Sequence, residues 1–134
     1  MHEPLSCSVL VVEDDDVMRR TLHRQLSSLG CDVTLTGDAG EFLSALHDAS
    51  GRIDAVVIDI RLPGLHGDLL ISWLRDSEQE VVRRMPVLVA TGHPADIPDE
   101  ILLDSDRVRV LAKPFTLLQL RQAILDLTRP GTVH

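Results

Sequence analysis

The chain has 134 residues, with 13 Lys plus Arg against 21 Asp plus Glu and a formal net charge of −8. This length is typical of one domain with its own hydrophobic core. The acidic balance, together with an aromatic content of 2%, disfavours direct binding to nucleic acid. No apolar run approaches the roughly 18 residues of a membrane span, and the N-terminus lacks the pattern of a signal peptide. We therefore expect one cytoplasmic domain that binds neither membranes nor nucleic acid.

Five short runs rich in β-branched residues predict five strands. The first, third and fourth runs are apolar without alternation, which is typical of strands covered on both faces. Cys7 and Cys31 are too few for a disulfide scaffold, and we expect both to be buried small apolar residues. In chain order, the predicted strands span residues 7–12, 32–36, 54–59, 86–91 and 107–112.

Apolar residues at helical spacing follow the first strand and predict the first helix. Gly30 is placed to end this helix. Asp16 is expected to cap its N-terminus, with Asp15 as a solvated first-turn acid. The apolar stripe consists of Met18, Leu22, Leu26 and Leu29.

Four more helices are expected between and after the remaining strands. Asp38 and Glu41 form a capping-box pattern at the start of the second helix. The third helix is expected over about 70–83. The fourth should be the weakest, because Pro98 limits where it can begin. The fifth carries an apolar stripe that ends near Leu127.

This alternation predicts an α/β fold with a doubly wound parallel sheet and helices on both faces. Ligands in such folds lie at the carboxyl ends of the strands, so the residues just past each apolar run are informative. Four acids that begin with Glu13 and Asp14 follow the first strand, and Asp59 ends the third. Thr91 ends the fourth strand, and Lys113, the only lysine, follows the fifth.

Each of these residues alone has an ordinary explanation, such as a loop acid or a solvated lysine. Together they would bring several carboxylates to one edge of the sheet, where like charges repel one another unless cations compensate. Lys113 supplies one positive charge. Mg²⁺ suits the remainder, because it accepts one or two carboxylates, keeps several waters and leaves room for phosphate oxygens.

In order and separation, four segments resemble the receiver domains of bacterial two-component response regulators. They are VLVVEDDDVMRRTL, AVVIDIRLPGLHG, PVLVATG and LAKPF. The resemblance implies a receiver domain over 7–128, followed by a short tail over 129–134. It also implies a CheY-like sheet in strand order 2-1-3-4-5 with five helices, and a cis Lys113–Pro114 bond.

The resemblance implies a phosphorylation site that uses Mg²⁺. Carried over by position, Asp59 would be the phosphoacceptor. Glu13 and Asp14 would be the acidic pair that orders the metal, and Asp59 and the backbone carbonyl of Arg61 would be further ligands. The domain would act in signalling and not as an enzyme.

The remaining site residues would handle the phosphoryl group. Thr91 would contact it through its hydroxyl group, and Lys113 would pair with it by charge. The donor would be a phosphohistidine on a histidine kinase or a phosphotransfer protein, since the chain lacks nucleotide-binding glycine motifs. We expect the output to be contact with another protein through the fourth helix, fifth strand and fifth helix. The six residues after Thr128 are too few to build an output domain.

Three positions depart from the family pattern. Glu13 stands where an Asp is more frequent and is expected to reach the metal through water. His66 replaces a frequent acid. Val110 replaces the aromatic residue whose rotation usually follows the Thr hydroxyl, so we expect signalling to rely on loop movement around 92–94.

Two other classes use related chemistry. A haloacid dehalogenase-type phosphohydrolase also has a strand-end Asp, a Thr and a Lys, but it needs a second Asp where this chain has Arg61. A flavodoxin-like cofactor carrier needs hydroxyl and backbone donors after the first strand, and four acids there would repel a phosphate. A test of flavin absorbance distinguishes that carrier.

Overall fold

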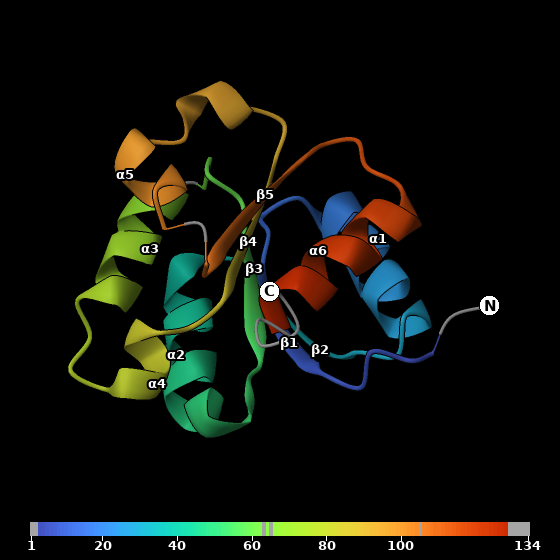
Figure 1. Cartoon of the computed structure of the whole chain (residues 1–134), viewed down its shortest axis with the longest axis horizontal. Coiled ribbons are helices and arrows are strands. Elements are labelled where there is room, and N and C mark those ends of the chain that lie inside the picture. Colours follow the sequence, from blue (N-terminus) through green and yellow to red (C-terminus); the bar gives the residue numbers. More distant parts are fainter. Residues whose placement is uncertain (1–2, 63, 65, 105, 129–134) are drawn as a thin grey trace.

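The computed structural model describes residues 3–62, 64, 66–104 and 106–128, so the predicted tail over 129–134 lies outside the described residues. Five parallel strands form one sheet in the order β2-β1-β3-β4-β5, which confirms the predicted topology (Figure 1). Each predicted strand agrees with the observed one to within one residue at either end. The strands are β1 Ser8–Val12, β2 Asp32–Thr36, β3 Ala55–Ile58, β4 Val87–Thr91 and β5 Val108–Ala112.

Helices cover both faces of the sheet. In Figure 1, α1 and α6 lie on one side, and α2, α3, α4 and α5 lie on the other. Short 3₁₀ turns, η1 (Ser50–Arg52) and η2 (Pro94–Asp96), follow α2 and β4. The helices are α1 Asp16–Ser28, α2 Ala39–Ala49, α3 Gly67–Arg75, α4 Glu80–Arg83, α5 Asp99–Leu102 and α6 Leu117–Thr128. None of the helices in these described ranges has the length and hydropathy to span a bilayer.

The central strands are buried on both faces, as their lack of alternation predicts. Val9 and Val11 of β1 pack with Leu26 of α1 and Ile124 of α6. Leu10 and Val12 point to the opposite face, where the cluster includes Phe42, Leu70 and Val82. Alternate side chains of a strand thus pack into two separate hydrophobic cores, one on each face, which holds the sheet between the two helical layers.

The third predicted helix is wrong in its extent, and the described chain has six helices where five were expected. The chain leaves the helix at Arg75 and re-enters one at Glu80. Between them, the Ser77 amide donates to the carbonyl of Leu74, and the Ser77 hydroxyl accepts a bond from the Gln79 amide. Such local bonds compete with the helical ladder, which explains the break.

The start of α1 is displaced by one residue from the prediction. Asp15 is the N-cap, because its backbone is extended and its carboxylate accepts a hydrogen bond of 3.0 Å from the Val17 amide. Asp16 is the first helical residue. Gly30 follows the helix with φ +92°, which confirms its predicted role as a C-terminal stop.

Three other local predictions are confirmed. Asp38 accepts a bond of 2.8 Å from the Glu41 amide, which confirms the cap of α2. The helix after Pro98 is only four residues long, as expected for the weakest one. Cys7 and Cys31 are buried, as expected of small apolar residues, and their sulfur atoms lie 3.5 Å apart without a disulfide bond.

Candidate functional site

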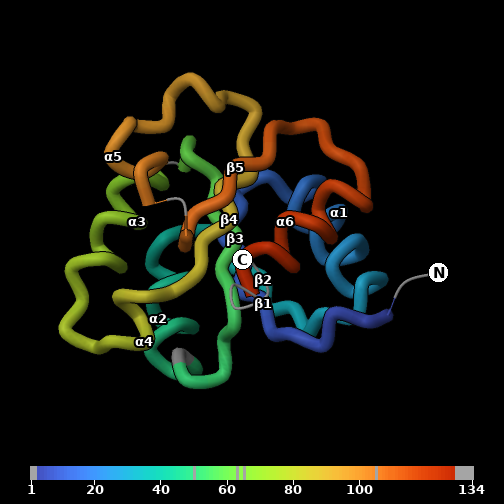
Figure 2. The backbone as a smooth tube through the Cα atoms, viewed as in Figure 1, coloured from blue at the N-terminus to red at the C-terminus, as the bar shows by residue number. Residues whose placement is uncertain are grey.

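The predicted site residues meet at the carboxyl edge of the sheet, which is the upper edge in Figures 1 and 2. The register pairs Val12 with Ile58, so Glu13 and Asp59 leave neighbouring strands at the same level. It also pairs Thr91 with Ala112, the residue before Lys113. Parallel strands therefore bring together residues that are up to 100 positions apart in the sequence.

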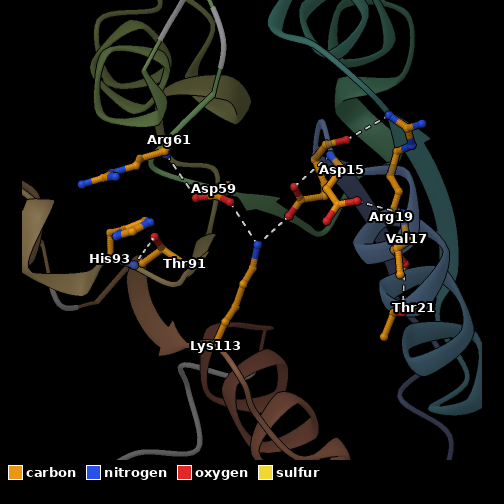
Figure 3. A network of polar contacts seen from close by, with 10 residues as sticks. Asp15, Val17, Arg19, Thr21, Asp59, Arg61, Thr91, His93 and Lys113 are labelled. Atoms are coloured by element: carbon orange, nitrogen blue, oxygen red, sulfur yellow. Dashed lines mark hydrogen bonds and ion pairs between the residues drawn. The ribbon is translucent and has the colours of Figure 1, made fainter.

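Lys113 connects two of the carboxylates (Figure 3). Its Nζ atom lies 2.6 Å from Oε1 of Glu13 and 3.0 Å from Oδ2 of Asp59. The Lys113 side chain is 15% exposed, and those of Glu13 and Asp59 are 3% and 12% exposed. Because all three groups are largely shielded from water, their mutual attraction is stronger than that of a surface ion pair.

Burial and charge act in opposite directions on this group. Burial raises the pKa of the Glu13 carboxyl, and the hydrogen bond and charge of Lys113 offset part of that rise. Burial alone would lower the pKa of Lys113, but hydrogen bonds to Glu13 and Asp59 and their charges outweigh it, so this pKa is raised. Lys113 is thus held as a cation.

The backbone around Asp59 is tightly constrained. Its Oδ1 atom accepts a hydrogen bond of 3.1 Å from the Arg61 amide. The amide of Gly67, the first residue of α3, donates to the carbonyl of Ile60 at 2.8 Å. A Cβ atom at Gly67 would overlap the carbonyl oxygen of Asp59. Gly67 is therefore a site residue that sequence reasoning missed, and a glycine at the start of a helix was the available signal.

Thr91 is completely buried at the end of β4. Its hydroxyl accepts a bond of 3.0 Å from the His93 amide, and its carbonyl accepts one of 2.8 Å from the Lys113 amide. These bonds join the ends of β4 and β5 beside Asp59. The Lys113–Pro114 peptide bond is cis, as the resemblance implies.

The acids after β1 have different environments. Glu13 is buried, and its second oxygen accepts a bond of 3.2 Å from the Asp15 amide. Asp14 is exposed, and its carboxylate has no hydrogen-bond partner within the described part of the chain. Asp14 thus has free oxygen ligands, whereas both Glu13 oxygens are engaged.

The described residues contain no ready metal site, that is, no group of three or more Asp, Glu, His or Cys side chains placed to hold one ion. Of the predicted ligands, Glu13 and Asp59 both pair with Lys113. Mg²⁺ needs no such cluster, since one or two carboxylates with waters and a carbonyl can suffice. The hard oxygen donors at this edge fit that ion.

The three departures from the family pattern have clear positions. Glu13 uses its longer side chain to reach Lys113. His66 precedes α3 and makes no side-chain cap. Val110 is half-exposed on the edge strand β5, with 36% of its surface accessible.

A family model described as the response regulator receiver domain matches residues 9–125. The chain belongs to this family. Receiver domains are phosphoacceptors in two-component signalling, which establishes the main functional class expected from the resemblance. The comparisons support this reading and not the haloacid dehalogenase alternative.

Relatives of the receiver domain include longer regulators. The response regulator MprA of Mycobacterium tuberculosis is 35% identical over 129 residues, which cover 94% of this chain and 54% of MprA. The transcriptional regulatory protein FixJ of Bradyrhizobium diazoefficiens is 37% identical over 108 residues, covering 80% of this chain and 49% of FixJ. The chain thus spans about half the length of these relatives.

Solved structures agree with the fold. A receiver domain from Clostridium thermocellum superposes with a TM-score of 0.78 at 23% identity, covering 96% of this chain and 99% of that one. The receiver domain of the sensor histidine kinase PA1611 from Pseudomonas aeruginosa superposes with a TM-score of 0.74 at 31% identity, covering 92% of this chain and 98% of that one. The PA1611 structure is described with a magnesium ion coordinated in its active site cleft.

Gly67→Ala tests the close approach of α3 to Asp59. The added methyl group would force the two backbones apart, and overpacking of this kind costs about 1–3 kcal/mol. We expect a lower free energy of unfolding in urea and shifted amide resonances at residues 59–61. Gly51→Ala is the control, because among the described residues, its two chain neighbours aside, no heavy atom lies within 4 Å of its added Cβ. Equal stability of the two variants would contradict the steric role of Gly67.

Proposed function

We propose that Asp59 is the phosphoacceptor of this receiver domain and takes its phosphoryl group from a phosphohistidine. The observation that supports this most strongly is the position of Asp59. Its carboxylate lies at the end of β3, 3.0 Å from the Lys113 ammonium group. The proposed role is that of a signalling phosphoacceptor in the cytoplasm, and not of an enzyme.

The transfer is a displacement at phosphorus. An oxygen of Asp59 forms a bond to the phosphorus atom, and the bond between phosphorus and the histidine nitrogen of the donor breaks. The imidazole leaves with the electron pair and takes up a proton. Both reactants are anionic, so the charge of Lys113 would reduce the repulsion between them. The Thr91 hydroxyl would donate a hydrogen bond to an oxygen of the transferred group.

Asp14 and Asp59 would hold Mg²⁺ directly, together with the backbone carbonyl of Arg61. Glu13 would act through water, because Lys113 and the Asp15 amide already occupy its oxygens. When bound, the ion supplies positive charge to the phosphoryl oxygens. The carboxylate of Asp14, which is exposed and has no hydrogen-bond partner among the described residues, supports this assignment.

The partners would be a histidine kinase or phosphotransfer protein and a downstream protein. The predicted output face corresponds to α5, β5 and α6, because α4 is the extra helix formed by the break in the third. Apolar side chains are exposed on all three elements: Leu102 of α5 is 45% exposed, Val110 of β5 36% and Leu118 of α6 61%. Such exposed apolar groups suit a protein contact, and we propose no direct contact with nucleic acid.

Phosphorylation of Asp59 is tested with acetyl phosphate and Mg²⁺. We expect one phosphoryl group on the wild-type protein by intact-protein mass spectrometry, removable with hydroxylamine as an acyl phosphate should be. Asp59→Asn should remain unmodified, because it lacks the nucleophile. The matched control is Asp48→Asn, which changes an exposed acid on α2. Modification of Asp59→Asn at the wild-type yield would identify another acceptor.

The Mg²⁺ site is tested by titrating the ion and following the amide resonances of residues 59–61. Asp14→Asn should weaken binding by at least the roughly tenfold that even an outer-shell partner typically contributes. Asp59→Asn should also weaken it, and Asp48→Asn should not. An unchanged affinity in Asp14→Asn would rule out Asp14 as a ligand.

The output face is tested with beryllofluoride, a phosphoryl mimic, in the presence of Mg²⁺. We expect amide shifts to extend from the Asp59 loop into residues 92–122, because the loops after β4 and β5 border both the site and the face. The same additions to Asp59→Asn provide the control. Shifts confined to the Asp59 loop would show that the proposed face is wrong.

A further inference from the structure

Arg61 links the loop after β3 to the segment after β4. Its amide donates to Oδ1 of Asp59 at 3.1 Å. Its guanidinium group lies against Oδ2 of Asp96, with Nε at 2.7 Å and Nη2 at 2.6 Å. Figure 3 shows the Arg61 side chain extended away from the Asp59 carboxylate. The backbone of Arg61 therefore serves the site, while its charge is held elsewhere.

The other end of this link is the 3₁₀ turn η2. The His93 amide donates to the Thr91 hydroxyl, and the Asp96 amide donates to the His93 carbonyl, each at 3.0 Å. Asp96 thus ends a short bonded segment that begins at Thr91. Through Asp96, the ion pair ties this segment to the loop that carries Asp59.

We propose that Asp96 is a positioning residue that holds the Arg61 guanidinium away from Asp59, and that a phosphoryl group on Asp59 competes with Asp96 for it. This inference rests on the proposed function, because it takes Asp59 as the phosphoacceptor. A phosphoryl group carries more negative charge than one carboxylate and offers three acceptor oxygens to a guanidinium fork.

The exposure of the pair suits such an exchange. The side chain of Arg61 is 53% exposed and that of Asp96 is 43% exposed, so the guanidinium can swing without breaking a packed core. Exposed ion pairs of this kind shift an equilibrium by at most about fivefold. Lys113 is less suited to move, because it is 15% exposed and already contacts both Glu13 and Asp59.

Release of Asp96 would change the restraint on η2 and on α5, which follows it. Both elements contact β5, part of the proposed output face. Movement of the Arg61 guanidinium from Asp96 to the phosphoryl group would therefore couple the site to that face without an aromatic side chain at position 110. The two states are Arg61 paired with Asp96 and Arg61 paired with the phosphoryl group on Asp59. Phosphorylation shifts the equilibrium between them only because the phosphoryl group binds the guanidinium in the second state and not in the first.

The experiment measures the dissociation constant of beryllofluoride, with Mg²⁺ present, from the amide resonances of residues 59–61. Asp96→Asn should tighten binding by about two- to fivefold, because it removes the competitor for Arg61. Arg61→Gln should weaken binding. In the Arg61→Gln background, Asp96→Asn should have no further effect, as expected for residues that act through one another. Asp99→Asn, an exposed acid on α5, is the matched control and should match the wild type.

If Asp96 had only a structural role, Asp96→Asn would bind beryllofluoride more weakly. The direction of the change in affinity therefore distinguishes a structural role from the proposed competition for Arg61. Unchanged or weaker binding, or the same effect in both backgrounds, would overturn the inference and leave the proposed function intact. If the wild type fails to bind beryllofluoride, or Asp59→Asn binds it equally well, the proposed function fails and this inference fails with it.

Discussion

One ammonium group holds the carboxyl edge of this protein together. Without the Nζ atom of Lys113, the carboxylates of Glu13 and Asp59 would face each other from neighbouring strands with little water to screen their repulsion. The lysine directly follows β5, which lies two strands from β3 and three from β1, so only a long side chain can reach both acids. The site thus depends on the complete sheet being formed in this strand order.

The same contact explains why a glutamate suits the end of β1. Both oxygens of Glu13 are engaged, one by Lys113 and one by the Asp15 amide, and burial raises the pKa of this carboxyl. Asp14 beside it is exposed and unpartnered within the described structure. Two adjacent acids therefore serve different purposes: one positions the lysine, and the other is available to a hard cation.

Arg61 separates this site from that of a phosphohydrolase with a second catalytic aspartate. At that position the chain presents a guanidinium group, which pairs with Asp96 and not with the Asp59 carboxylate. The backbone amide of the same residue still supports Asp59. A single residue thereby connects the proposed phosphoacceptor to the segment that leads towards α5 and β5. On β5, Val110 stands in place of the aromatic residue that usually responds to phosphorylation.

The sequence by itself determined the strand cores, the sheet order by resemblance, and the five polar residues at the strand ends. These follow from local hydrophobic patterns and from the rule that parallel strands end at one edge. It did not determine the break after Arg75, where the bonds around Ser77 compete with the helical ladder. Nor did it determine which of the adjacent acids caps α1, because any of them can accept the amide bond that Asp15 accepts. Only the tertiary structure decided that Lys113 pairs with Glu13, that Arg61 pairs with Asp96, and that Gly67 must lack a side chain. Those contacts join residues from different loops, and their distances are fixed only when the strands and helices pack against one another.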